Sequence, residues 1–319
     1  MESIKTKRAV IVEKNKVELE EVEIVMKEDE VLIKNEVCGL CSSEIDFITG
    51  ERKVDYPMPF GHEPAGRIIA IGKDIKNYKV GDRVTGFWMP GFSEYGNISA
   101  EKIILIPDNV KTEYALGEPL FCITNIIKMA AVEFGDFVMV VGCGGMGMAA
   151  IASLANSGAA GIIAVDVLDN KLELAGELGA TVTINSAKEN VVEKVMSVTK
   201  GHRIDVAIEL TGRSNCIDIA STSMRRPRGR LLIASAHVEP QTCNMLVWAE
   251  RSTIVYNAHP SYTMDRMDDL RRTMLMLGKG IFRMDKIITH RFTLDKFQDA
   301  VDTLLNKPAD YIKGIVTMQ

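Results

Sequence analysis

One stretch, FVMVVGCGGMG at residues 137 to 147, decides the fold of the second half of this chain. The apolar run at 137–141 predicts a buried strand, and the glycines that follow match G-x-G-x-x-G ahead of an apolar helical segment. Asp166 ends the next predicted strand, nineteen residues after Gly147. A glycine turn between strand and helix, followed by an acid at this spacing, predicts a dinucleotide-binding unit.

The residues of this turn have a physical use in binding a dinucleotide. Glycines permit a tight turn and close backbone approach, and a helix N-terminus offers free N–H groups and a positive dipole end to a pyrophosphate. An acid at position 166 accepts hydrogen bonds from both ribose hydroxyls and repels a 2′-phosphate, which favours NAD over NADP. A turn that merely packs strand against helix is the alternative interpretation. The candidate cofactor-binding residues here are Gly142, Gly144, Gly145, Met146, Gly147, Asp166 and, after the strand predicted at 204–210, Thr211.

Strands and helices alternate from about residue 122 onward. This alternation predicts a parallel, doubly wound sheet of about six strands with helices on both faces, an α/β architecture. Asp169 is a candidate N-cap of the second helix. The predicted strands are 137–141, 162–166, 181–184, 204–210, 230–234 and 253–256, and the predicted helices are 146–157, 171–178, 189–200 and 215–224.

The first 110 residues have a different rhythm, with short strands separated by glycine and proline turns. This spacing predicts a β-rich barrel or sandwich-like domain. The tail predicts a short strand at 287–289, an amphipathic helix at 293–305 and a final strand at 312–318. The predicted strands of the first part are 9–12, 30–37, 65–71 and 83–85.

Length and composition indicate an ordinary globular protein. The 319 residues predict about two domains, with 46% hydrophobic and 25% charged residues. A net charge of -5, with both signs mixed along the chain, argues against nucleic acid as a partner. Six cysteines do not make a disulfide framework, and no apolar leader is visible, so we expect a cytoplasmic protein. The uncharged segment 137–165 is long enough to span a bilayer, but its glycines interrupt any continuous membrane helix.

Four residues of the first part have side chains that bind metals: Cys41, His62, Glu63 and Glu118. One thiolate, one imidazole and carboxylates are typical of a catalytic zinc that keeps an open coordination position. Each residue alone has an ordinary interpretation, such as a surface histidine, or a redox pair of Cys38 with Cys41.

Several motifs occur in one order: GLCSSE at 39–44, GHE at 61–63, VGDRV at 80–84 and GEPL at 117–120, followed by the glycine turn. In this order the chain resembles the zinc-dependent medium-chain alcohol dehydrogenases, with sorbitol and threonine dehydrogenases as the nearer relatives. The resemblance implies a GroES-like catalytic domain at 1–121 and 264–319 and a Rossmann NAD-binding domain at 122–263. It places the active site in the cleft between them.

The resemblance also implies residue roles. Cys41 and His62 match zinc ligands, Glu63 matches a carboxylate that either ligates or hydrogen-bonds, and Glu118 matches a further ligand that acts directly or through water. Ser43 matches the hydroxyl residue that takes the alcohol proton. Lys171 matches a lysine near the adenosine ribose, with a solvated helix lysine as the alternative.

The sequence departs from the family pattern at two places. Thr85 to Pro90 leads straight into Gly91, without the lobe of four cysteines, so we expect one catalytic zinc and no structural zinc. Asp46 stands where many relatives have a histidine that passes the proton toward solvent. Either this carboxylate relays the proton, or the relay runs through water or the cofactor ribose.

The leading hypothesis is a zinc-dependent oxidoreductase that transfers hydride between a secondary alcohol and NAD. The substrate would be a polyol, cyclitol, sugar derivative or amino alcohol, and the resemblance implies a dimer or tetramer. The alternatives are a zinc-free NAD(P)H quinone or enone reductase of the same superfamily and a non-catalytic protein that retains the fold. His237, after the strand at 230–234, is either close to the nicotinamide or a solvated loop histidine.

Overall fold

The computed structural model describes residues 3–237, 239–259 and 263–318, and it contains two compact units. Unit 1 comprises Met1–Leu120, Leu270–Gly280 and Met284–Gln319, and unit 2 comprises Phe121–Asp269 and Ile281–Arg283. The domain bounds expected from the sequence differ from these at the second crossing. There the predicted catalytic segment begins at residue 264, whereas unit 1 resumes at Leu270.

Unit 2 is built on a six-stranded parallel sheet with the order β11-β10-β9-β12-β13-β14. The chain starts at the centre with β9, builds outward through β10 and β11, and then returns to the other side of β9 with β12. The predicted doubly wound sheet is thereby confirmed, and its switch point lies between β9 and β12. The strands are β9 (Phe137–Val141), β10 (Gly161–Asp166), β11 (Val182–Asn185), β12 (Val206–Glu209), β13 (Arg230–Ile233) and β14 (Ile254–Asn257).

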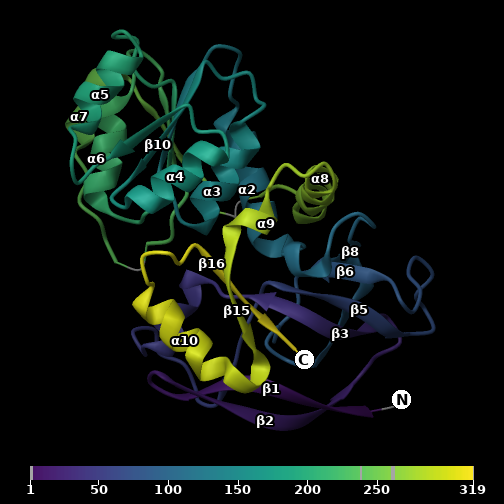
Figure 1. The fold of residues 1–319 in the computed structure, drawn as a ribbon. Helices are drawn as coiled ribbons and strands as arrows, with labels where there is room; N and C mark the ends of the chain where they lie inside the picture. The colour runs from purple at the N-terminus through teal and green to yellow at the C-terminus, as the bar shows by residue number, and fades with distance from the viewer. Residues whose placement is uncertain (1–2, 238, 260–262, 319) are drawn as a thin grey trace. The chain divides into compact units, whose positions relative to one another are not determined.

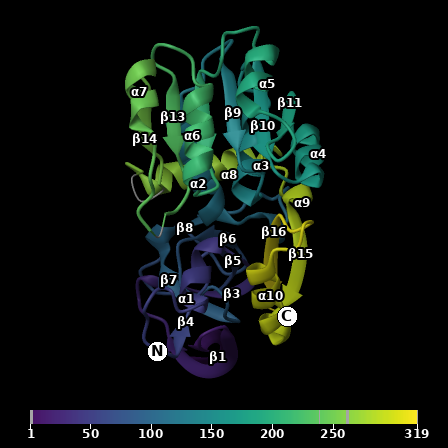
Figure 2. The ribbon, with the colours of Figure 1, turned by 90° about the vertical axis from the view of Figure 1, so that its left-hand side faces the viewer.

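Helices cover both faces of this sheet (Figure 1). On one face lie α3 (Gly145–Leu154) and α4 (Asp169–Glu177), which contact β9, β10 and β11. On the other lie α5 (Val191–Val198), α6 (Ser214–Ser223) and α7 (Met245–Arg251), side by side over the strands in Figure 2. The apolar segment 137–165 is thus β9, α3 and most of β10, and none of the described helices is long and apolar enough to cross a membrane.

The predicted N-cap of α4 is wrong. Leu168 occupies the cap position, and Asp169 lies inside the first turn, where its Oδ1 accepts a hydrogen bond from Asn185 Nδ2 at 2.7 Å. The physical reason is that Asp166 already accepts hydrogen bonds from the N–H groups of Val167 and Leu168. The N–H groups of Val167 and Leu168, just before the helix, are therefore satisfied by Asp166 and not by an N-cap at Asp169.

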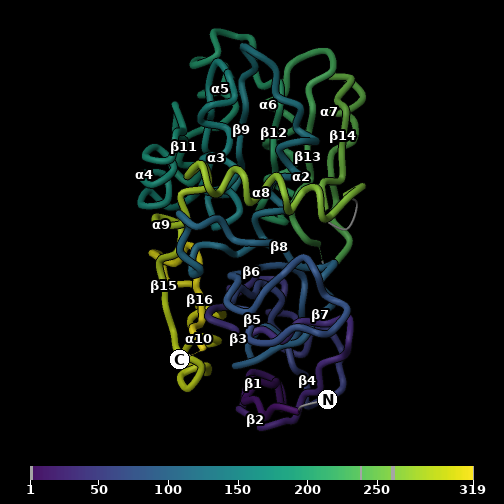
Figure 3. Tube along the Cα trace, turned by 90° about the vertical axis from the view of Figure 1, so that its right-hand side faces the viewer, coloured from purple at the N-terminus to yellow at the C-terminus, as the bar shows by residue number. Residues whose placement is uncertain are grey.

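Unit 1 contains a three-stranded sheet, β2-β1-β4, and a seven-stranded sheet with the order β15-β16-β3-β5-β6-β8, in which β7 also pairs with β3. The predicted β-rich domain is confirmed. Strand β16, from the far end of the chain, lies beside β3 (Figure 3). The strands are β1 (Ser3–Glu13), β2 (Lys16–Val25), β3 (Glu30–Gly39), β4 (Met58–Pro59), β5 (Pro64–Ile71), β6 (Arg83–Gly86), β7 (Tyr95–Ser99), β8 (Ile103–Leu105), β15 (Ile288–Thr293) and β16 (Lys313–Thr317).

Further helices complete the described fold. The short α1 (Ile45–Ile48) follows β3, α9 (Met284–Ile287) precedes β15, and α10 (Phe297–Asn306) packs on β2, β15 and β16. The longer α2 (Gly117–Ala130) and α8 (Arg266–Gly278) each carry the chain from one unit to the other. The tail prediction is confirmed in type and order, since a strand, a helix and a strand follow one another there.

Three buried phenylalanines hold the part of unit 1 that carries the metal-binding residue types. Phe60, Phe92 and Phe297 pack edge to face, with ring centroids 4.7 to 5.4 Å apart. Gly61 follows Phe60 with φ +94°, and a Cβ there would lie 2.7 Å from the backbone nitrogen of Phe92. The loop that enters β5 is therefore fixed both by aromatic packing and by a glycine that no other residue can replace without strain.

Candidate functional site

Three predicted metal ligands lie together in unit 1. One ligand atom each from Cys41, His62 and Glu63 lies within 4.8 Å of the other two, a grouping found once in the part of the chain that the structure describes. The pairing of β3 with β5 explains this, because Cys38 stands opposite Pro64 and the residues just beyond each strand end meet. Cys38 itself is fully buried in the core.

Glu63 is buried and held by a lysine from the far end of the chain. Lys313 Nζ on β16 lies 2.7 Å from Glu63 Oε1 and 2.6 Å from Oε2, and it donates to Leu40 O at 2.9 Å. Burial lowers the pKa of Lys313, but the charges of Glu63 and Cys41 outweigh it and raise the pKa above its ordinary value. Because Lys313 stays charged, Glu63 is a hydrogen-bonded member of the cluster, and it has lone pairs left with which to ligate a metal.

His62 is oriented by a carboxylate that the sequence analysis did not single out. Its Nδ1 lies 3.0 Å from Oε1 of Glu44, which is buried and also accepts a hydrogen bond from Gly61 N at 3.0 Å. This contact leaves Nε2 for a metal. Burial lowers the pKa of His62, and hydrogen bonds with Cys41 and Glu44 raise it to a net value of about 12. The available signal was an acid three residues after Cys41, on the same short turn.

The remaining predicted residues of unit 1 are not members of the three-residue cluster. Ser43 Oγ lies 3.2 Å from Cys41 Sγ. Asp46 lies half-buried in the first turn of α1, which begins at Ile45. Glu118 lies in the first turn of α2 and is not part of the three-residue cluster. The roles expected for these three residues stay predictions.

The donor set of this cluster fits a zinc ion. Sulfur, nitrogen and carboxylate oxygen are the atoms that zinc prefers, and three protein ligands leave a fourth position for a substrate or water. The carboxylate that orients His62 and the lysine that orients Glu63 supply the outer contacts that such sites require. Cys41, His62 and Glu63 are therefore the residues that would hold the metal.

Unit 2 has a cavity of about 260 Å³ at the carboxyl ends of β9, β10 and β12, where the sheet switches direction. Open α/β sheets bind their ligands at this point. Gly142, Gly144, Asp166 and Thr211, all predicted, line it. The complete lining is Val141, Gly142, Gly144, Val165, Asp166, Val167, Ser186, Leu210, Thr211, Arg213, Cys216 and Ile219.

Three of the other predicted residues, Gly145, Met146 and Gly147, form the first turn of α3. There they present the free N–H groups expected at a helix start. Lys171 lies half-buried on α4 and is not among the lining residues. Arg213, Ser186 and Cys216 line the cavity but were not predicted, since each lies on a loop or helix start without a motif of its own.

Asp166 is fixed by backbone groups on both of its oxygens. Oδ2 accepts a hydrogen bond from Cys143 N at 2.8 Å, and Oδ1 accepts from Val167 N at 2.8 Å and from Leu168 N at 3.1 Å. Oδ2 therefore keeps a free lone pair for a further donor. Burial and the charge of Asp166 raise the pKa of Cys143 to about 12, so this thiol stays neutral. The cavity wall carries one fixed negative charge.

The glycines of the turn serve two different purposes. Gly142 has φ +98°, and a Cβ on Gly147 would lie 1.9 Å from the carbonyl oxygen of Gly142. At both positions the chain itself requires glycine. Gly144 has φ -80°, and a Cβ added there would meet nothing within 4 Å, so the protein alone tolerates a side chain at this position. The open space at Gly144 is available to a ligand.

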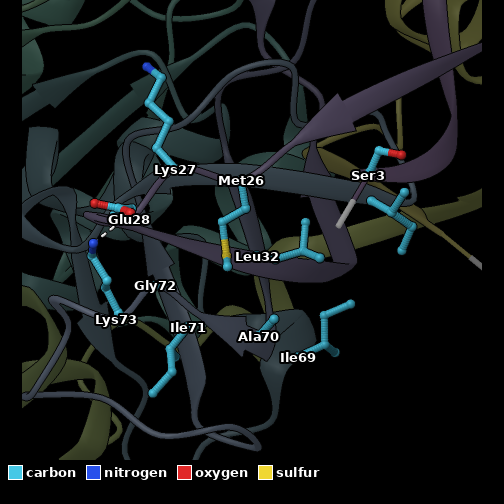
Figure 4. A pocket seen from close by; sticks show the side chains of 11 residues that line it. Ser3, Met26, Lys27, Glu28, Leu32, Ile69, Ala70, Ile71, Gly72 and Lys73 are labelled. Atoms are coloured by element: carbon cyan, nitrogen blue, oxygen red, sulfur yellow. Dashed lines mark ion pairs between the residues drawn. The ribbon is translucent and has the colours of Figure 1, made fainter. Parts of the chain in front are cut away.

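A second cavity, of about 600 Å³, lies in unit 1 among Met26, Leu32 and Ile71, with the Glu28–Lys73 ion pair at its rim (Figure 4). Leu32 and Ile71 lie at the opposite ends of β3 and β5 from the metal-binding cluster. The lining also includes Ser3 and Lys27, but it contains none of the predicted metal-binding, catalytic or cofactor-binding residues. Its larger volume therefore does not make it the reactive site.

Two family models match the chain. The one described as "Alcohol dehydrogenase GroES-like domain" matches residues 27–108, and the one described as "Zinc-binding dehydrogenase" matches residues 145–265. Together they match well over half of the sequence. Their order along the chain is the order of the β-rich unit and the parallel-sheet unit.

Curated relatives and solved structures agree with these matches. The chain is 27% identical to sorbitol dehydrogenase of Bacillus subtilis, covering 90% of each chain, and 27% identical to D-xylulose reductase of Scheffersomyces stipitis, covering 86% of each. The crystal structure of an Escherichia coli oxidoreductase/dehydrogenase of unknown specificity superimposes with a TM-score of 0.89 at 25% identity, covering 99% of this chain and 100% of that one. The chain belongs to the zinc-type medium-chain alcohol dehydrogenase family.

Proposed function

We propose that this protein is a zinc-dependent oxidoreductase that transfers a hydride between a secondary alcohol and NAD. The observation that carries the proposal is the cluster of Cys41, His62 and Glu63, in which Glu44 orients His62 and Lys313 holds Glu63. Sulfur, nitrogen and oxygen donors in one place, with a carboxylate behind the imidazole, are the requirements of a catalytic zinc.

The residues around the cluster support a specific division of work. A bound zinc supplies Lewis acidity that lowers the pKa of an alcohol. Ser43 Oγ, 3.2 Å from Cys41 Sγ, is the group that accepts the alcohol proton, and Asp46 on the next turn receives it from Ser43. Glu44 holds the His62 ring in place throughout. A nicotinamide cofactor held by the glycine turn and Asp166 of unit 2 would supply the hydride acceptor.

NAD is favoured over NADP by the fixed charge in the unit 2 cavity. Both oxygens of Asp166 are held by backbone N–H groups, so the carboxylate cannot swing away from a 2′-phosphate. Repulsion between two anions in a partly enclosed site disfavours the phosphorylated cofactor. The neutral ribose hydroxyls of NAD donate to the same carboxylate.

A polyol is the substrate class with the most support. Sorbitol dehydrogenase is named for a polyol and D-xylulose reductase for a keto sugar, and Glu118 matches the carboxylate that the polyol enzymes use. Cyclitols, sugar derivatives and amino alcohols share the secondary alcohol. The zinc-free quinone or enone reductase is not favoured, because such an enzyme has no use for a thiol, an imidazole and a carboxylate held together.

The proposal has three further parts. The protein binds one zinc per chain, works in a reducing compartment and associates with copies of itself. The sequence has no cysteine between Cys41 and Cys122, where a structural zinc would need four. The six cysteines, all in the described part of the chain, are unpaired, which suits the cytoplasm. Strand β14 is the edge of the parallel sheet and exposes Ile254, which suits a homo-oligomer.

The test is the metal content of the purified protein combined with NAD reduction over a panel of polyols, cyclitols and amino alcohols, before and after chelation. We expect about one zinc per chain and chelator-sensitive activity. Both are lost in Cys41→Ala and kept in Cys243→Ala, a half-buried cysteine of unit 2. A metal-free protein that reduces enones with NADPH would establish the reductase instead, and NADH binding without any turnover would establish a non-catalytic protein.

A further inference from the structure

Strand β12 ends in a carboxylate that the family motifs do not explain. Glu209 is fully buried, and its Oε1 accepts hydrogen bonds from Thr211 N at 2.6 Å, from Gly212 N at 3.1 Å and from the hydroxyl of Thr211. Thr211 lines the unit 2 cavity. One oxygen of Glu209 therefore fixes the loop that leaves β12 and forms part of the cavity wall.

The other oxygen fixes the neighbouring loop. Glu209 Oε2 accepts a hydrogen bond from Ser235 Oγ at 2.5 Å, and Ser235 Oγ lies 3.1 Å from His237 Nε2. Ser235 follows β13, which pairs in parallel with β12. The two loops are in close contact, since a Cβ on Gly212 would lie 3.0 Å from Ala236 O. A single buried carboxylate thus joins the loops that leave two adjacent strands.

Chemistry fixes the directions of the hydrogen bonds that run from Glu209 through Ser235 to His237. A serine hydroxyl has one proton, and an ionised carboxylate is a far stronger acceptor than an imidazole nitrogen. Ser235 therefore donates to Glu209 and accepts from the N–H of His237 Nε2. The half-buried Ser235 thereby holds the exposed His237 ring, with Nδ1 left to face another partner.

These three hydrogen-bonded residues lie at the ends of β12 and β13, and this position on the sheet indicates which part of a cofactor they contact. A dinucleotide lies across the switch point with one mononucleotide half over each half of the sheet. Asp166, at the end of β10, marks the adenosine side. By this rule the other half would lie over the loops that leave β12 and β13, on the other side of β9, although Thr211 at the start of the first loop also lines the cavity that contains Asp166.

We infer that Glu209 and Ser235 are positioning residues for the nicotinamide half of the cofactor, and that they present His237 as a polar contact for it. The inference rests on the proposed use of NAD. Burying a carboxylate is costly unless donors surround it, and four neutral donors from two loops surround this one. The carboxylate thereby ties the loop that leaves β12 to the loop that leaves β13.

The experiment compares the binding of NADH and ADP, since ADP carries the adenosine and both phosphates but neither nicotinamide nor its ribose. In Ser235→Ala we expect the dissociation constant of NADH to rise roughly tenfold, the effect of losing a hydrogen bond to a charged group, and that of ADP to stay unchanged. Ser235→Thr keeps the hydroxyl and restores NADH binding. Ser153→Ala is the matched control, because that half-buried hydroxyl donates to Ala149 O on α3 and neither residue lines the cavity.

A second variant separates positioning from general loosening. Glu209→Gln touches both loops, so we expect it to weaken NADH and, through Thr211, also ADP. Its thermal unfolding is measured in parallel, and Ser235→Ala is the deciding variant if Glu209→Gln does not fold.

Equal loss of NADH and ADP in Ser235→Ala, or no loss of either, would overturn the inference. A wild-type protein that binds neither NADH nor NADPH would instead overturn the proposed function. The two failures are therefore distinguishable.

Discussion

The metal-binding cluster of unit 1 and the glycine turn of unit 2 are built in opposite ways. The cluster consists of side chains from distant parts of the sequence, and Lys313 lies 250 residues from the Glu63 that it holds. The turn consists of backbone groups, with β9, the glycines and β10 all within residues 137–166. A site made of side chains fails when an atom is removed, whereas a site made of backbone fails when an atom is added.

The largest expected effect is at the cluster. Replacing Cys41 by serine removes the sulfur ligand, and we expect metal content to fall from about one zinc per chain to nearly none, with loss of alcohol oxidation. NADH binding, measured by fluorescence titration, should stay at the wild-type level because the cavity of unit 2 is untouched. Retained zinc in Cys41→Ser would mean that the cluster does not depend on its individual side-chain atoms.

The second largest effect is expected when a methyl group is added to the glycine turn. In Gly147→Ala the new Cβ would lie 1.9 Å from Gly142 O, and overpacking of this kind costs about 3 kcal/mol of unfolding free energy. Gly144→Ala adds the same methyl into open space, so we expect wild-type stability but weaker NADH binding. Urea unfolding and NADH titration of both variants check this. Equal stability of the two would contradict the assigned roles of these glycines.

The third effect concerns the residue behind His62. Glu44→Gln keeps the shape but removes the charge that orients the ring, and we expect zinc affinity to fall about 10–100-fold. Competition with a zinc chelator of known affinity measures it. Glu36→Gln is the control, since Glu36 pairs with Arg67 on the surface of the same unit. An unchanged zinc affinity in Glu44→Gln would show that backbone, and not side chains, orients the cluster.

The smallest effect is expected at a glycine of unit 2 that lies outside the glycine turn. Gly176 lies on the exposed side of α4, where a Cβ meets nothing within 4 Å. Gly176→Ala should therefore raise the free energy of unfolding by about 0.5–1 kcal/mol through helix propensity, with NADH binding unchanged. If Gly176→Ala lost NADH binding, an added methyl group would disturb the cofactor site from anywhere in unit 2, and the sensitivity would not be specific to the glycine turn.

The sequence predicted the parallel sheet well because its strands are buried on both faces. The uninterrupted apolar runs of β9 and β10 leave little ambiguity. Strand β2, KVELEEVEIV, was missed because it is mostly exposed and rich in glutamate. Helix α8 was missed for a related reason, since RMDDLRRTMLMLG begins with closely spaced charges that hide its apolar stripe.

The sites divide in the same way. The glycine turn was predictable because its geometry depends on residues close together in sequence. Cys41, His62 and Glu63 were recognised by chemical type and motif, and the structure places their ligand atoms together. Glu44 and Lys313 were not found, because the contacts that define them span 18 and 250 residues and depend on the tertiary fold.

The placement of β16 has a consequence for how the protein is made. Leu40 N donates to Gly314 O, and Lys313 Nζ donates to Leu40 O across 273 residues of sequence. A ribosome therefore delivers Cys41, His62 and Glu63 long before the strand that braces them, and the whole of unit 2 is synthesised in between. Unit 2 has its own core and can fold during that interval. The hydrogen bonds by which Lys313 holds Glu63 therefore form only after residue 313 has been synthesised, when all three ligands and the whole of unit 2 already exist.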